Sequence, residues 1–127
     1  MTENQIATTI VDTAYHIHAD IGPGLFETVY ERIMEVELTK RGLTVLRQEP
    51  IPIVYKGVHF KSGFTCDLLV QSKVIVEVKS IEAIHPVHRK QVITYLRFAD
   101  KRLGLLINFN VALIKDGIVR VVNNLHD

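Results

Sequence analysis

Apolar residues recur every three or four positions in three parts of the chain, a spacing typical of amphipathic helices. The first predicted helix covers residues 4–19, and the glycine- and proline-rich segment 22–24 ends it. The second runs over about residues 26–41, with Gly42 as its C-terminal cap. The residues expected on the buried stripes are Ile6, Ile10, Ala14 and Ile17 in the first helix and Val29, Ile33 and Val36 in the second.

The third predicted helix begins at His85-Pro86, because proline is tolerated in the first turn of a helix. It extends to about Ala99, which is expected to face the core together with Val92 and Leu96. This helix is long enough to cross over between two parallel strands.

The remaining apolar segments are short and bounded by turn residues, which predicts strands. The expected strands between the second and third helices are residues 44–48, 51–55, 58–60, 64–70 and 74–79, with a tight turn at Lys56-Gly57. Residues 103–109 are almost continuously apolar, which predicts a strand buried on both faces. Residues 111–114 and 118–122 are expected to form a closing hairpin. The pattern predicts one α/β domain over residues 1–127, a mixed β-sheet flanked by helices.

Composition excludes several classes of protein. Of the 127 residues, 47% are hydrophobic and 23% are charged, which is typical of a globular chain. The apolar runs are too short to span a bilayer, so no membrane partner is expected. The N-terminus lacks the basic start and apolar stretch of a secretory signal, and a single cysteine excludes an internal disulfide framework. We expect a soluble cytoplasmic protein.

Charge is distributed unevenly, although the net charge is only +1. Residues 1–37 carry a net charge of −6, residues 38–78 carry +3 and residues 79–102 carry +4. Two interpretations remain open: a basic face that meets a polyanion, or solvated faces of opposite sign.

Three charged residues interrupt two successive apolar strands: Asp67 in the first strand, and Glu77 and Lys79 in the second. Charges are rarely buried without a partner, because removing them from water costs several kcal/mol. Alternation places Glu77 and Lys79 on one face of their strand, and a hairpin would bring Asp67 beside them. The spacing alone also fits an exposed hairpin with a Glu–Lys pair, worth at most about 1 kcal/mol.

These residue types suit a site for a divalent cation and a phosphate. Magnesium takes oxygen ligands and keeps several waters, so Asp67 and Glu77, with the carbonyl of Val78 as an extra ligand, are sufficient to hold it. Lys79 can hold an attacking water or neutralise charge that develops on the phosphate.

Several separate motifs resemble one known family over roughly residues 5–123. They are G-x-x-E-x-x-Y at residues 24–30, Q-E-P-I-P at 48–52, D-L-L-V at 67–70, V-I-V-E-V-K at 74–79, Gln91 with Tyr95, and R-L-G-L-L-I-N-F-N at 102–110. The chain is similar to the GxxExxY family, a branch of the PD-(D/E)XK nuclease superfamily. The resemblance implies a restriction-endonuclease-like core.

The resemblance also implies roles for particular residues. The superfamily's D…E-x-K set, which binds Mg²⁺ (with Mn²⁺ as a substitute) and hydrolyses phosphodiesters, would be Asp67, Glu77 and Lys79. Thr65-Cys66 stands where a proline usually precedes the aspartate, a departure at a position that is not a ligand. The other residues implied for the site are Glu27 as an added carboxylate and metal ligand, and Gln91, Tyr95, His88 and Tyr30 as substrate-binding residues.

The leading hypothesis is therefore a metal-dependent nuclease acting on DNA, with RNA as a second substrate class. The alternative is a catalytically silent nucleic-acid-binding or oligomeric module that keeps the nuclease fold, and a purely structural protein is a third option. A homodimer is a further expectation, because a domain of this size can need a second subunit to grip a duplex. His85 and His88 have a spacing able to bind zinc, but no second ligand pair follows them.

Overall fold

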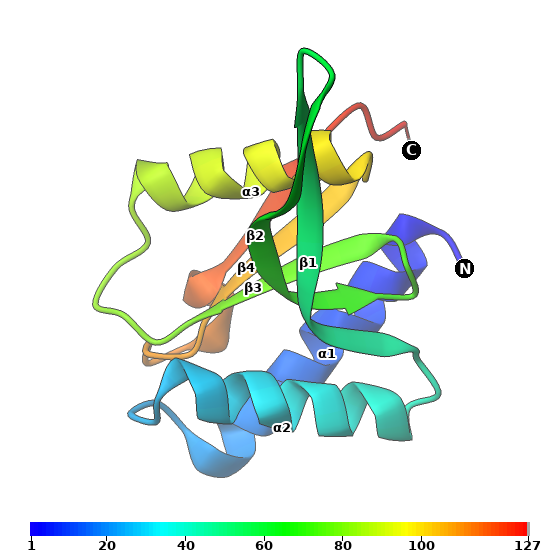
Figure 1. Cartoon of the computed structure of the whole chain (residues 1–127). Coiled ribbons are helices and arrows are strands. Elements are labelled where there is room, and N and C mark those ends of the chain that lie inside the picture. Colours follow the sequence, from blue (N-terminus) through cyan, green and yellow to red (C-terminus); the bar gives the residue numbers. More distant parts are fainter. Residues whose placement is uncertain (127) are drawn as a thin grey trace.

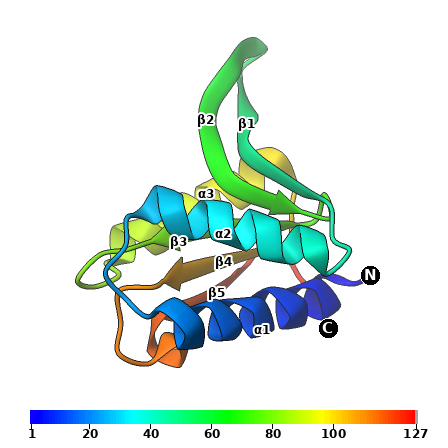
Figure 2. The same ribbon diagram turned by 90° about the horizontal axis from the view of Figure 1, so that it is seen from below.

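A five-stranded mixed sheet, with helices on both faces, forms the frame of the molecule (Figures 1 and 2). The computed structural model describes residues 1–126. The elements in chain order are α1 (Glu3–Ile21), α2 (Glu27–Lys40), β1 (Val45–Tyr55), β2 (Val58–Val70), β3 (Val74–Lys79), α3 (Pro86–Ala99), β4 (Leu103–Asn108), the 3₁₀ turn η1 (Ile114–Gly117) and β5 (Ile118–Val122). The strands follow each other across the sheet in the order β1-β2-β3-β4-β5. This architecture confirms the predicted mixed α/β fold with a restriction-endonuclease-like core.

The central pair, β3 and β4, is parallel, and α3 connects the two strands as predicted. The other neighbouring strands are antiparallel. All six residues of β4 are buried, which agrees with its continuously apolar sequence. β3 therefore lies in the middle of the sheet, and β4 pairs with it as far as Lys79.

The two faces of the sheet have separate hydrophobic cores. Val74, Val76 and Val78 of β3 point into the core that α1 and α2 cover. Ile75 points to the opposite core, which Val92 and Leu96 of α3 close. Alternation along β3 then assigns Glu77 and Lys79 to the α3 face.

The predicted stripe of α2 is wrong at two of its three positions: Val29 and Val36 are exposed, whereas Ile33 is partly buried against the core. The buried apolar side chains of this helix are Tyr30, Met34 and Leu38. Apolar residues occur on more than one side of α2, so helical spacing alone fits two stripes. The larger side chains, four residues apart, are the ones that pack against α1 and the sheet.

Two predictions for the strands also need correction. The segments expected as separate short strands merge into the long hairpin of β1 and β2, because a left-handed Gln48 and a bulge between Ile51 and Ile53 absorb the interruptions. The closing hairpin is wrong as well. Residues 114–117 form η1, whose Gly117 packs against the carbonyl of Asn108, and β5 pairs with β4 instead.

The far end of the β1–β2 hairpin projects from the rest of the molecule (Figures 1 and 2). We call residues 52–63 the arm. The tight turn at its tip is at Lys56-Gly57, as predicted. Within residues 1–126, no helix combines the length and the apolar character that a membrane span requires.

Candidate active site

The sequence-predicted acids meet where β2 separates from β3. The two strands pair only over Leu68–Val70 and Val74–Val76, and the ladder ends at the Leu68–Val76 pair. Beyond this point β2 bends away toward the arm (Figure 2). Asp67 and Glu77 are the next residues on the two strands, so they face the opening in the sheet.

The two carboxylates replace the backbone hydrogen bonds that the ladder loses. The backbone N–H of Asp67 donates to Oε2 of Glu77 at 2.7 Å, and the N–H of Val78 donates to Oδ2 of Asp67 at 2.8 Å. Each acid thus binds the backbone of the opposite strand. We call this reciprocal pair the clasp. It fixes both carboxylates and satisfies backbone donors that would otherwise be unpaired.

Gln48 and Glu31 extend this network, and sequence reasoning did not assign them to the site. The amide Nε2 of Gln48 donates to Oε1 of Glu31 at 2.8 Å and to Oδ1 of Asp67 at 3.3 Å. Glu31 is buried on α2, and its other partner is Arg47 at 3.7 Å. A signal was present: Gln48 opens the motif at residues 48–52, Glu31 directly follows the motif at residues 24–30, and a glutamate on a buried helix face requires a partner.

Burial raises the pKa of all three acids. It raises the pKa of Glu77, which is only 6% exposed, to about 8, and the nearby Asp67 charge adds to this effect. Burial is also the main cause of the raised pKa of Asp67 and of Glu31, and in both cases the Gln48 hydrogen bond opposes it. Within residues 1–126, no lysine or arginine forms an ion pair with Asp67 or Glu77.

Lys79 and Glu27 lie at the same end of β3. The Lys79 ammonium is near enough to oppose the upward pKa shifts of both Asp67 and Glu77. Glu27 begins α2, and its Oε1 accepts a hydrogen bond from the N–H of Ser80 at 3.3 Å, directly after Lys79. Its charge also raises the pKa of Asp67, so the structure brings the four predicted charged residues into one neighbourhood.

The first three turns of α3 border this neighbourhood. The phenol pKa of Tyr95 is raised by burial and then by the charges of Glu77 and Asp67, which places its ring beside the clasp. His88 has a lowered pKa, caused first by desolvation and then by the Lys79 charge. Its Nδ1 accepts the backbone N–H of His85 at 2.9 Å, so the two histidines cap a helix in this structure. Gln91 is exposed one turn before Tyr95.

Tyr30 has a different place from the one its motif implied. It is fully buried, its ring stacks on Phe109 with centroids 4.4 Å apart, and its hydroxyl donates to the carbonyl of Gly22 at 2.5 Å. The same hydroxyl accepts the N–H of Leu25 at 3.2 Å. Because no part of this ring is exposed, Tyr30 shapes the loop before Glu27 and has no surface for substrate.

Asn108 is a second supporting residue that the sequence analysis did not single out. It is buried at the end of β4, in register with Lys79. Its side chain accepts the N–H of Ile81 at 3.1 Å and donates to the carbonyl of Ile81 at 3.0 Å. An asparagine at the end of an apolar strand was the available signal, since such a residue must find hydrogen-bond partners. Asn108 thereby holds the chain that follows Lys79.

The donor set fits a hard divalent cation that keeps part of its water shell. The carboxylates of Asp67 and Glu77, which have no ion-pair partner in residues 1–126, offer oxygen ligands, and a cation would relieve their mutual repulsion. Among residues 1–126, no three histidine, cysteine, aspartate or glutamate side chains gather as a metal cage. An ion held here would therefore complete its shell with water, backbone or substrate oxygens, as Mg²⁺ commonly does.

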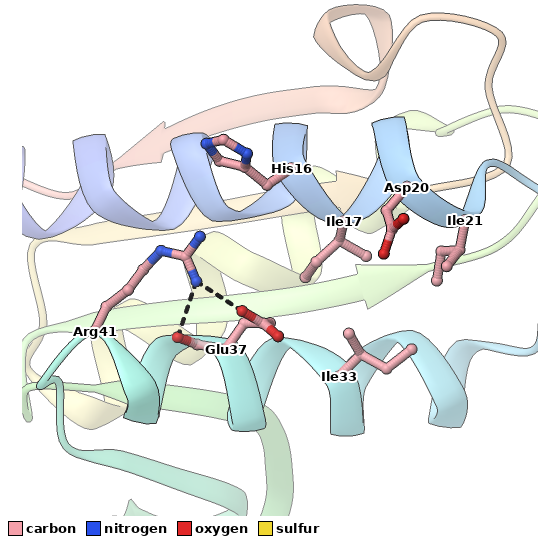
Figure 3. Close-up of a pocket in the computed structure, with 7 residues that line it drawn as sticks. All are labelled: His16, Ile17, Asp20, Ile21, Ile33, Glu37 and Arg41. Carbon is pink, nitrogen blue, oxygen red and sulfur yellow. Dashed lines mark hydrogen bonds and ion pairs between the residues drawn. The ribbon is translucent and has the colours of Figure 1, made fainter.

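A groove between α1 and α2, with a volume of about 490 Å³, lies on the other side of the sheet (Figure 3). Its acids include Asp20 and Glu37. The Arg41 guanidinium donates to the Glu37 carboxylate at 2.9 Å and lowers the pKa of that group. This groove contains none of the sequence-predicted site residues.

The fold and the clasp together define a mixed α/β protein with a carboxylate and lysine centre at the end of a core strand. The chain belongs to the PD-(D/E)XK nuclease superfamily, whose family model matches residues 4–121. No match was found among curated proteins or among solved structures.

Proposed function

We propose that this protein is a Mg²⁺-dependent nuclease that hydrolyses phosphodiester bonds of DNA, with RNA as a second substrate class. The observation that carries the proposal is the clasp: a buried Glu77 and a half-buried Asp67, neither with an ion-pair partner in residues 1–126, beside a lysine. The superfamily supports it, since PD-(D/E)XK nucleases generally use divalent metal ions. Within the superfamily, we place the chain in the GxxExxY branch because of its motif at residues 24–30.

The residues of the site divide into ligands and helpers. Asp67 and Glu77 would hold the ion, with Glu27 and the carbonyl of Val78 as further ligands. When bound, a divalent cation polarises the phosphodiester and lowers the pKa of a bound water. Lys79 would orient the attacking water and stabilise negative charge on the phosphate.

Three polar residues on α3 would contact the substrate. His88, Gln91 and Tyr95 occupy successive turns of the helix that borders the clasp. We assign them to contacts with phosphate or sugar oxygens, because an imidazole, an amide and a phenol all donate hydrogen bonds. Mn²⁺ is expected to replace Mg²⁺, since both accept oxygen ligands.

The proposal predicts a large loss of activity in three near-isosteric variants, Asp67→Asn, Glu77→Gln and Lys79→Met. Each should lower Mg²⁺-dependent cleavage of a labelled oligonucleotide by at least about a hundredfold, because each removes a ligand or a charge from the transition state. Calorimetric titration with Mn²⁺ gives the second readout: ion binding should vanish in Asp67→Asn and Glu77→Gln. Glu37→Gln in the α1–α2 groove is the matched control and should behave as wild type. Cleavage at wild-type rates in all three site variants would refute the assignment.

A second function is supported by one specific observation, the structural use of both carboxylates in the clasp. A module that binds nucleic acid without cutting it would need the clasp only to hold β2 against β3. In that case the oligonucleotide would bind equally well with and without divalent ions, and Mn²⁺ titration would show no binding to the wild-type protein.

A further inference from the structure

The arm carries an exposed apolar face that continues from the candidate active site. The register pairs Ile51 with Phe64, Ile53 with Phe60, and Tyr55 with Val58, so all six side chains lie on one face of the hairpin. Ile51 and Phe64 belong to the core that α3 closes. The face that packs on α3 at its base therefore becomes free surface toward the tip.

Two large rings are exposed on this free surface. Tyr55 is 62% exposed and Phe60 is 50% exposed, while Val58 between them is 54% exposed. At the base of the same face, Phe64 stacks on Tyr95 with centroids 4.0 Å apart, and Tyr95 borders the clasp. Aromatic side chains thus run along one face from the arm tip to the site.

The arm and α3 carry basic residues and no acids. Residues 50–66 contain Lys56, Lys61 and His59 but no aspartate or glutamate. The Nζ of Lys56 lies 5.4 Å from the centroid of the Tyr55 ring, at the arm tip. The helix α3 also has no acid, and it exposes Arg89, Lys90 and Arg97. By contrast, α1 contains three acids and no lysine or arginine.

We propose that the arm and α3 together bind single-stranded nucleic acid, with unpaired bases stacked on Tyr55 and Phe60 and the backbone along the basic residues. This inference rests on the proposed function and names the substrate form of that site. Proteins that bind single strands combine aromatic platforms with a cationic track, and both are present here. An apolar partner protein would explain the exposed rings but not the absence of acids across the arm and α3. The direct continuity of β2 from the arm to Asp67 would lead a bound strand to the clasp.

Binding is tested with the full-length protein in EDTA, so that no cleavage occurs. Fluorescence anisotropy would compare a labelled single-stranded DNA, an RNA of the same sequence and the matching duplex. We expect both single strands to bind at least about tenfold more tightly than the duplex. Tyr55→Ala and Phe60→Ala should each weaken single-strand binding by about fivefold to a hundredfold, the loss typical of one stacked base.

Val54→Ala is the matched control, because Val54 is 51% exposed on the opposite face of the arm and should leave binding unchanged. Tyr55→Phe should retain most of the affinity, since it keeps the ring. Equal affinity for duplex and single strand, or wild-type binding in both alanine variants, would overturn the inference. So would a dimer in sedimentation velocity that dissociates in Tyr55→Ala, because the face would then be a contact between copies of this chain.

The failure of this inference can be separated from failure of the proposed function. If the arm variants bind normally while Asp67→Asn abolishes cleavage, only the stacking face is wrong. If single strands bind through the arm but Mn²⁺ does not bind the wild-type protein, the arm inference stands and the nuclease assignment falls.

Discussion

The α1–α2 groove and the clasp each contain two acids, yet the pKa of a glutamate is shifted in opposite directions at the two places. In the groove, the Arg41 guanidinium donates a hydrogen bond to the Glu37 carboxylate and lowers the pKa of Glu37. In the clasp, Glu77 is buried beside another acid, and its pKa is raised to about 8. The same type of side chain thus forms an ordinary surface ion pair in the groove and a buried acid that keeps its proton in the clasp.

The difference shows what marks a functional acid in this chain. The presence of two carboxylates at one site is not the signal, since Asp20 and Glu37 also line one groove. The signal is burial without an ion-pair partner, a state in which the charged form of the acid is costly unless a ligand supplies an opposite charge. In the groove, Arg41 already neutralises Glu37. In the clasp, a bound metal ion could neutralise the two acids.

The largest expected effect on stability is a loss with rising pH in the metal-free protein. The pKa of Glu77 in the folded state lies above its ordinary value of 4.5, so the folded protein holds this proton longer than the unfolded chain. The stability that this proton contributes is fully present below about pH 4.5 and is lost as the pH rises to about 8. The free energy of unfolding should fall across this window by at most about 1.4 kcal/mol per pH unit for this group. Urea unfolding in EDTA at several pH values measures it.

Two variants isolate the contribution of Glu77 to that slope. Glu77→Gln cannot lose a proton and should flatten the fall, whereas Glu37→Gln should leave it intact because its pKa is shifted in the opposite direction. Addition of Mg²⁺ should restore the stability of the wild type at pH 8. A wild-type stability that rises between pH 5 and pH 8 would contradict the assigned burial of this proton.

A smaller effect on the free energy of unfolding is expected when Gln48, the uncharged hydrogen-bond partner of Asp67, is removed. Gln48→Ala deletes the amide that donates to Glu31 and Asp67, and it should destabilise the protein by about 1–2 kcal/mol. It should also steepen the pH dependence, because the Gln48 hydrogen bond lowers the pKa of both acids. Gln48 has a φ of 53°, so Gln48→Gly serves as the control without left-handed strain. If Gln48→Ala, which shares the left-handed strain of the wild type, keeps wild-type stability, the amide bonds contribute nothing.

The smallest effect on stability is expected from a substitution in the α1–α2 groove. Arg41→Ala removes the cation next to Glu37, but that carboxylate remains solvated, so the urea midpoint should not change within experimental error. A clear destabilisation by Arg41→Ala, as large as that from Gln48→Ala, would remove the contrast between the two regions.

Most helices and strands could be predicted from the sequence, because the patterns that indicate them are local. The helical repeats, the continuous apolar run of β4, and the hairpin that precedes Lys79 each depend on neighbouring residues. The corrected elements depend on distant contacts. The buried side of α2 is decided by packing against α1 and the sheet. Residues 118–122, the expected hairpin partner of residues 111–114, pair with β4 instead.

The same distinction applies to the candidate site. The D…E-x-K pattern identified Asp67, Glu77 and Lys79, and the structure brings Glu27 to them through the hydrogen bond from Ser80. Glu31 on α2 and Gln48 on β1 are 17 positions apart in sequence, and no spacing rule connects them. Their link to Asp67 appears only when β1 lies between α2 and β2, which is a property of the folded chain.

The clasp also acts as a check on correct folding. If β2 slipped by one residue against β3, the N–H that meets Glu77 would belong to Cys66 or Leu68, and the carboxylate of Asp67 would no longer reach Val78. A misaligned hairpin would lose the ion site together with the two hydrogen bonds. Ion affinity in this protein should therefore report the fraction of correctly folded molecules in a preparation.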